Sequence, residues 1–167
     1  MGLAKADFYY GALLSQLVNS GFAPAIIEKG ESRRIYKLAN DYSDYTLYCK
    51  YIKGPKLNEK GSVTWNFIFS AEEVQVILTN TAIDMYGFVC GKENLRGSEI
   101  AFLTRDEVIQ CIGEDYSSPE RRVSIQLDKS GIRAFKVYGT AIEIKESPLK
   151  ITRNMDTRLQ EFMPSRV

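Results

Sequence analysis

The fold is decided by residues 33–53, which read RRIYKLANDYSDYTLYCKYIK. Two runs rich in β-branched and aromatic residues flank residues 40–44, NDYSD, whose composition is typical of a turn. The pattern predicts a β-hairpin in which side chains two positions apart share a face. The face of Leu47 and Cys49 is the more apolar one, so we expect it to meet the core. Tyr48 and Lys50 are then expected to point outward.

Further elements extend in both directions from this hairpin. An apolar stripe over 4–19 predicts a helix, and alternation over 63–69 predicts a strand whose apolar face places Trp65, Phe67 and Phe69 near the core. Capping boxes at Ser70 and Thr104 predict helices over 71–79 and 105–112. Apolar segments predict strands over 85–90 and 100–103 and a second hairpin over 123–138.

These elements define an α+β class, because strands come in runs with few helices. We expect an N-terminal helix, two further short helices and a mixed or antiparallel sheet of about six to seven strands. The order is α-β-β-β-α-β followed by β-α-β-β. Residues 1–147 are expected to form one α+β domain, and residues 148–167 a C-terminal tail or short surface helix.

Composition excludes several classes of function. The 167 residues include 22 Lys+Arg, 21 Asp+Glu and no histidine, for a net charge of +1. A net charge this close to zero is not the strongly basic charge expected of a duplex-binding domain. A local stripe of basic residues is still compatible with this net charge. Without histidine there is no catalytic triad with a histidine base and no zinc site of His and Cys ligands. No apolar run approaches the length of a membrane span, so we expect no membrane partner.

The cysteines indicate a reducing compartment. Cys49, Cys90 and Cys111 are odd in number, well separated and set among apolar residues, and no apolar leader segment precedes them. We therefore predict a cytoplasmic location with buried free thiols. Cys90 is expected to be the most accessible of the three because Gly91 follows it at a strand end.

The leading α-β-β-β-α-β order resembles the core of the PD-(D/E)XK, or restriction-endonuclease-like, superfamily, over roughly residues 4–92. The resemblance implies a Mg²⁺ ion held between carboxylates and a lysine that positions the attacking water. At the corresponding strand Tyr48-Cys49-Lys50 supplies the lysine, but Tyr48 stands where the acid belongs. The catalytic motif is therefore degenerate at this strand.

A divergent nuclease is the alternative function. Glu143-Ile144-Lys145 is an acidic-x-Lys motif with Asp128 upstream, and Asp41 with Asp44 offers a second carboxylate set. Asp128, Glu143 and Lys145 would then be catalytic, with Mg²⁺ as cofactor. The competing interpretation is a charged strand edge beside a turn aspartate.

The preferred hypothesis is a non-catalytic binding or modulator protein without cofactor or metal. Its contact surface is a Tyr/Lys-rich hairpin, and the predicted partner-binding residues are Arg34, Lys37, Tyr48, Lys50, Lys53 and Lys56. Tyrosine brings large contact area at small entropic cost, and lysines beside aromatic rings suit phosphates. We expect a protein partner, with nucleic acid as the alternative, and the size and composition suit modulators of mobile-element or phage-defence systems. The sequence leaves the oligomeric state open.

Overall fold

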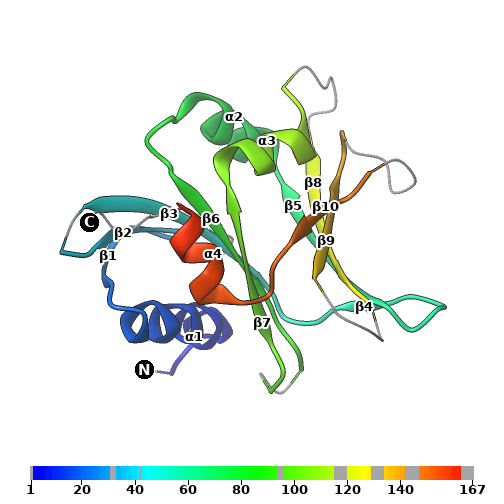
Figure 1. The fold of residues 1–167 in the computed structure, drawn as a ribbon, viewed down its shortest axis with the longest axis horizontal. Helices are drawn as coiled ribbons and strands as arrows, with labels where there is room; N and C mark the ends of the chain where they lie inside the picture. The colour runs from blue at the N-terminus through cyan, green and yellow to red at the C-terminus, as the bar shows by residue number, and fades with distance from the viewer. Residues whose placement is uncertain are drawn as a thin grey trace.

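The protein is described by a computed structural model that covers residues 2–30, 33–41, 43–93, 96–114, 120–128, 134–141 and 147–162. In this part of the chain four helices and ten strands confirm the predicted α+β class. The strands form two five-stranded sheets rather than the single sheet expected (Figure 1). Within the described residues, no helix has the length and apolar character needed to cross a membrane.

The first sheet has the strand order β1-β2-β3-β6-β7. Its strands are β1 (Ala23–Lys29), β2 (Arg34–Ala39), β3 (Asp44–Ile52), β6 (Met85–Cys90) and β7 (Glu99–Thr104). The predicted hairpin over 33–53 is confirmed as β2 and β3, in which Ile35 pairs with Tyr48. β3 and β6 run parallel, whereas the other neighbours are antiparallel. β1 was not predicted.

The second sheet has the strand order β10-β9-β8-β5-β4 and is antiparallel throughout. Its strands are β4 (Lys56–Leu57), β5 (Val63–Phe69), β8 (Arg121–Leu127), β9 (Phe135–Gly139) and β10 (Leu149–Ile151). The predicted alternation of β5 is confirmed, because Trp65, Phe67 and Phe69 are fully buried. The leading element order therefore contains β1 and β4 as well as the three expected strands, and β5 lies in another sheet than β2 and β3. The nuclease-like resemblance stays a hypothesis.

The helices are α1 (Lys5–Asn19), α2 (Ala71–Thr79), α3 (Arg105–Ile112) and α4 (Met155–Phe162). Both predicted capping boxes are present: the Ser70 hydroxyl accepts a hydrogen bond from the Glu73 backbone N–H at 3.2 Å, and Thr104 accepts one from Glu107 at 3.1 Å. Gly113 ends α3 at a φ of 75°, a conformation that favours glycine.

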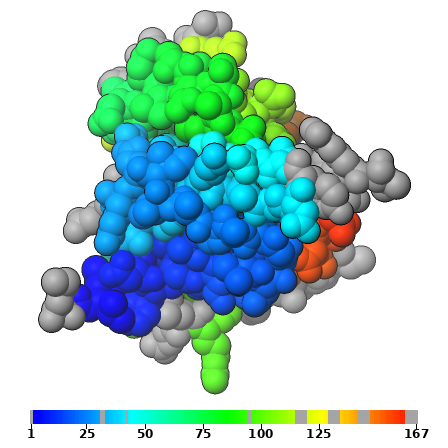
Figure 2. Space-filling model, turned by 90° about the vertical axis from the view of Figure 1, so that its left-hand side faces the viewer, coloured from blue at the N-terminus to red at the C-terminus, as the bar shows by residue number. Residues whose placement is uncertain are grey.

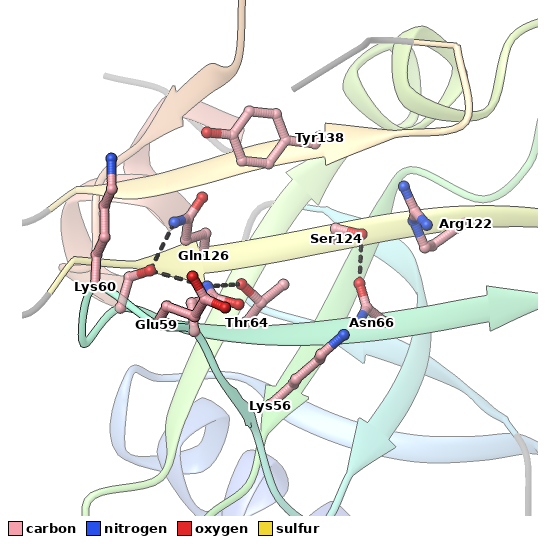
Figure 3. Close-up of a pocket in the computed structure, with 11 residues that line it drawn as sticks. Lys56, Glu59, Lys60, Thr64, Asn66, Arg122, Ser124, Gln126 and Tyr138 are labelled. Atoms are coloured by element: carbon pink, nitrogen blue, oxygen red, sulfur yellow. Dashed lines mark hydrogen bonds between the residues drawn. The ribbon is translucent and has the colours of Figure 1, made fainter. Parts of the chain in front are cut away.

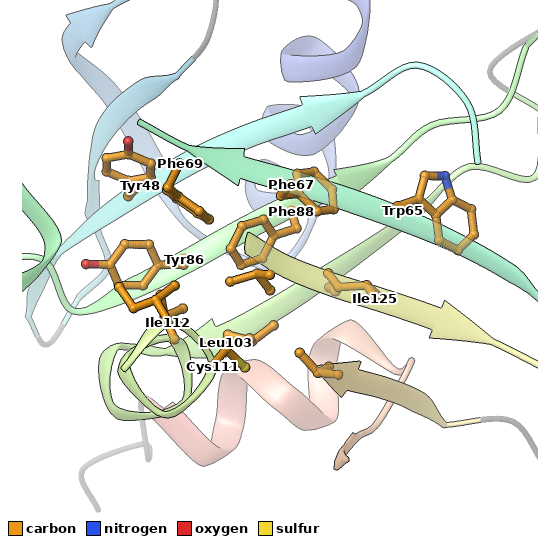
Figure 4. Close-up of a cluster of buried hydrophobic side chains, with 14 of the residues drawn as sticks. Tyr48, Trp65, Phe67, Phe69, Tyr86, Phe88, Leu103, Cys111, Ile112 and Ile125 are labelled. Carbon is orange, nitrogen blue, oxygen red and sulfur yellow. The ribbon is translucent and has the colours of Figure 1, made fainter. Parts of the chain in front are cut away.

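The layers explain where the cores lie. Aromatic residues of both sheets and apolar residues of α3 fill the space between the sheets (Figure 4). A second apolar cluster joins α1 and α4 to the opposite face of the first sheet. Figure 2 shows α1 below the strands β1–β3 and α2 above them. The described elements thus cover the first sheet on both faces and the second sheet on one.

This layering corrects the predicted orientation of Tyr48 and Lys50. The division into two faces is right, since Leu47 and Cys49 pack toward α1 while Tyr48 points the other way. That other face meets the second sheet instead of solvent, so Tyr48 is 0% and Lys50 6% exposed. The prediction assumed a sheet with one wet face, but β3 is a central strand of a sheet buried on both sides.

All three cysteines are free and buried, as predicted. Burial raises the pKa of each thiol, that of Cys111 to about 12. The expectation that Cys90 is the accessible one is wrong, because it lies in β6 between two neighbouring strands and is 0% exposed.

The segment after residue 147 packs against the rest of the protein. β10 pairs with β9, and α4 lies against β7. Arg158 Nε donates to the Phe102 carbonyl oxygen at 2.9 Å, and its guanidinium also contacts Glu107. The expected short helix is present, but Leu159 is 4% exposed and anchors it to the first sheet.

Candidate functional site

The outer face of the second sheet is polar and hollowed into a groove (Figure 3). The strands that bury Trp65 and Ile125 on the inner face turn hydroxyl, amide and charged side chains to the outer face. The groove has a volume of about 460 Å³, and its lining includes Lys56, Lys60, Asn66, Arg122, Ser124 and Gln126. We call this outer surface the polar face.

Strand register arranges the polar face in rows that cross the strands. One row, here called the lysine row, consists of successive pairing partners on β4, β5, β8, β9 and β10: Lys56, Thr64, Gln126, Lys136 and Lys150. The adjacent row, here called the amide row, consists of Asn66, Ser124 and Tyr138. Arg122 lies opposite Ile68 in the next position along. Residues distant in sequence are therefore neighbours on this face.

Hydrogen bonds orient the neutral side chains of the groove. Ser124 Oγ donates to Asn66 Oδ1 at 2.6 Å, and Gln126 Nε2 donates to Ser62 Oγ at 3.0 Å. Asn58 Nδ2 donates to both Ser62 Oγ and Thr64 Oγ1. These bonds leave Asn66 Nδ2 as a donor and Gln126 Oε1 as an acceptor with no partner among the described residues. The groove thus offers hydrogen-bonding groups of both kinds to a ligand.

Positive charge is concentrated on the polar face. Its described residues include five cations, Lys56, Lys60, Arg122, Lys136 and Lys150, and two carboxylates, Glu59 and Asp128. These seven residues together carry a charge of +3, whereas the whole chain carries +1. Asp128 Oδ2 lies 2.7 Å from Lys136 Nζ, and this hydrogen bond raises the pKa of Lys136. The Nε of Arg122 is buried and has no hydrogen-bond partner among the residues that the structure describes. An anion would meet attractive potential here.

The predicted partner-binding residues do not gather on one surface. Lys56 lines the groove, and Lys53 is exposed in the turn before it. Lys37 Nζ is 3.1 Å from Asp44 Oδ2 on the first sheet. The Arg34 guanidinium is buried between Asp7, at 3.0 Å, and the Tyr10 ring.

Tyr48 and Lys50 belong to a buried network between the two sheets. Lys50 Nζ lies 2.7 Å from Glu73 Oε2 and donates to the Ile68 carbonyl oxygen at 2.9 Å, while the Tyr48 hydroxyl donates to the same Glu73 oxygen at 2.6 Å. Burial lowers the pKa of Lys50, with Glu73 opposing the shift. Burial also raises the pKa of Tyr48. The network connects β3, β5 and α2, so its evident role is structural.

The alternative catalytic residues are not assembled in the described part of the chain. Asp128 is held by Lys136, Asp44 is held by Lys37, and Asp41 is exposed. Glu143 and Lys145 lie outside the described residues. Across the ranges that the structure describes, no group of three or more Cys, Asp or Glu side chains could hold a metal ion.

Sequence reasoning missed the polar face because its rows combine five strands. A usable signal exists within single strands: Thr64 and Asn66 alternate with Trp65 and Phe67. The same alternation of polar and apolar residues recurs over residues 122–127. Comparison of this chain with models of known families, with curated proteins and with solved structures finds no match.

Proposed function

We propose that this protein is a non-catalytic binding module of the cytoplasm, and that it engages an anionic partner through the polar face. The supporting observation is the combination of a hollow, net positive charge and unused hydrogen-bonding groups on one sheet face. Concave sites with a few convergent polar groups are where proteins bind ligands. The proposal moves the contact surface from the predicted Tyr/Lys-rich residues over 33–56 to the second sheet and retains Lys56 from the original set.

The kind of partner follows from the chemistry of the face. Protein–protein contact centres are depleted in charged residues and enriched in apolar and aromatic ones. The polar face instead carries lysines around neutral amides and hydroxyls, and of its strand residues Ile68 is the exposed large apolar one. A partner rich in negative charge therefore suits it better than an apolar protein surface.

Affinity capture with charge-reversed variants tests the proposal. The double variant Lys56→Glu and Lys150→Glu reverses two exposed cations of the polar face. The control Lys5→Glu and Lys29→Glu changes the net charge by the same amount at exposed positions on α1 and β1. Captured material is scored for protein and for nucleic acid after equal thermal stability of the variants has been confirmed.

The expected result is a component recovered by the unmodified protein and by the control but lost from the polar-face variant. Equal recovery by both variants contradicts the proposal. If both retain the component, the cations of the polar face are not needed for binding; if both lose it, long-range repulsion acts from any face rather than at this one.

A further inference from the structure

The two rows of the polar face have dimensions that suit a polymer lying across the strands. Neighbouring strands are about 4.8 Å apart, so the lysine row extends about 19 Å from Lys56 on β4 to Lys150 on β10. Its cations are Lys56, Lys136 and Lys150. The amide row runs parallel to it, displaced by two residues along each strand, which is about 6.6 Å. A row with lysines at both ends, and with Lys136 paired to Asp128, thus runs beside a line of neutral hydrogen-bonding groups.

This arrangement matches a polymer with charge along one side and neutral polar groups along the other. Phosphates pair with lysine as a point charge, and base edges pair with amide and hydroxyl side chains. Within the described residues, Asn66 Nδ2 is the free donor that the amide row offers to such edges, and Gln126 Oε1, in the adjacent lysine row, is a free acceptor. An acidic peptide provides the charge but no comparable series of neutral planar edges.

Resting on the function proposed above, we propose that the partner is single-stranded nucleic acid that crosses the second sheet. Its phosphates follow the lysine row, and its bases lie over Asn66, Ser124 and Tyr138. A duplex fits poorly, because its major groove is read by an element that protrudes, such as a helix, and this face is hollow. Tyr138 is 6% exposed, so base stacking contributes little and phosphate contacts dominate affinity.

Fluorescence anisotropy measures the salt dependence that this proposal requires. The probe is a labelled single strand of about 12 nucleotides, within the usual range of site sizes. Each phosphate contact contributes about 0.7 to the slope of log affinity against log salt. The slope is negative, and replacing exposed Lys150 by Ala is expected to make it shallower by about 0.7. The same replacement is expected to weaken binding about fivefold at 0.1 M salt.

Two further variants separate the roles of the rows. Lys29→Ala, on the edge strand β1, removes an exposed lysine from a different face and is expected to change neither affinity nor slope. Asn66→Ala removes the free donor of the amide row and is expected to weaken binding with an unchanged slope, because it contacts no phosphate. Thermal unfolding of each variant verifies that it is folded.

Three outcomes overturn the identification of the partner. One is a slope unaffected by Lys150→Ala, and another is equal affinity for a duplex of the same length. The third is the absence of binding at about 100 µM protein, the weak end of non-specific affinities. If any of these occurs while the capture experiment still loses a component from the polar-face variant, the binding function stands and the partner is another polyanion. If capture also fails, both proposals are wrong.

Discussion

The two sheets have the same number of strands but different surroundings. The first is enclosed by α1 and α4 on one face and by the second sheet on the other, so even Tyr48 and Lys50 of its hairpin are buried. The second buries one face, and none of the described helices or strands covers its other face, which carries the groove (Figure 1). Tyrosine and lysine on a strand thus do not by themselves indicate a surface, because the layer arrangement decides which face meets water.

The contrast is clearest in two lysine–carboxylate pairs with the same separation. Lys50–Glu73 and Lys136–Asp128 each have an N–O distance of 2.7 Å. The first pair lies between the sheets with side chains at most 9% exposed, whereas the second lies on the polar face with side chains near 40% exposed. Water screens the second pair and barely reaches the first, so the same contact has different energetic consequences.

Truncating the tyrosine of the hairpin tests the enclosure of the first sheet most strongly. Tyr48→Ala empties a fully buried site beside Phe69 and Tyr86 and removes a hydrogen bond to Glu73. We expect the free energy of unfolding to fall by about 3–5 kcal/mol in urea titrations. Thr64→Ala on the polar face is the control, with an expected loss under about 1 kcal/mol. Similar losses for Tyr48→Ala and Thr64→Ala would mean that the Tyr48 face of the first sheet is as open to solvent as the polar face.

Local patterns were sufficient to predict most individual elements. The capping boxes at Ser70 and Thr104 marked the starts of α2 and α3, and alternation marked β5 and the first hairpin. The missed strands are those with weak local signals: β4 has two residues, β10 has three, and β1 contains Pro24, a residue that disfavours strand assignment.

The division into two sheets and the site itself depend on pairing between distant segments. β3 pairs with β6 rather than with β5, which follows it more closely, and no local pattern distinguishes these choices. The lysine row needs the register of four strand pairs before Lys56 and Lys150 can be seen as members of one row. The sequence supplied the polar alternation but not which strands would lie side by side.

Removing the buried carboxylate is the second test of the comparison. Glu73→Ala leaves the Lys50 ammonium and the Tyr48 hydroxyl without their shared acceptor. We expect a loss of about 3 kcal/mol in the free energy of unfolding, typical of an unpaired buried charge. Glu72→Ala, one residue earlier and 78% exposed at its side chain, is expected to cost under about 1 kcal/mol. Comparable losses at the two positions would contradict the structural role of the network.

The pH dependence of stability should follow the buried pair. Burial alone would raise the pKa of Glu73, but hydrogen bonds from Lys50 and Tyr48 outweigh it and hold the pKa below the ordinary 4.5. A carboxyl group whose pKa is lower in the folded chain stabilises the fold above its unfolded pKa. That contribution is lost as the pH falls through the folded pKa.

We therefore compare the free energy of unfolding of the protein with that of Glu73→Ala. The difference between them is expected to have its full value at neutral pH and to shrink on acidification below about pH 4.5. Urea titrations at several pH values measure it, with Glu72→Ala as the reference whose difference stays small throughout. A Glu73→Ala difference that is constant down to about pH 3 would exclude the proposed ionisation of this carboxyl.

The smallest change in the free energy of unfolding is expected when a single charge is removed from the polar face. Asp128→Ala separates Lys136 from its partner, but the lysine remains in contact with water and can be solvated without a partner. The expected change in the free energy of unfolding is under about 1 kcal/mol and should vanish in about 1 M salt, where the Debye length is about 3 Å. The Glu73→Ala loss should persist under the same conditions because salt does not reach a buried pair. A salt-resistant loss of several kcal/mol at Asp128 would show that the polar face is closed, and the distinction between the two sheets would then fail.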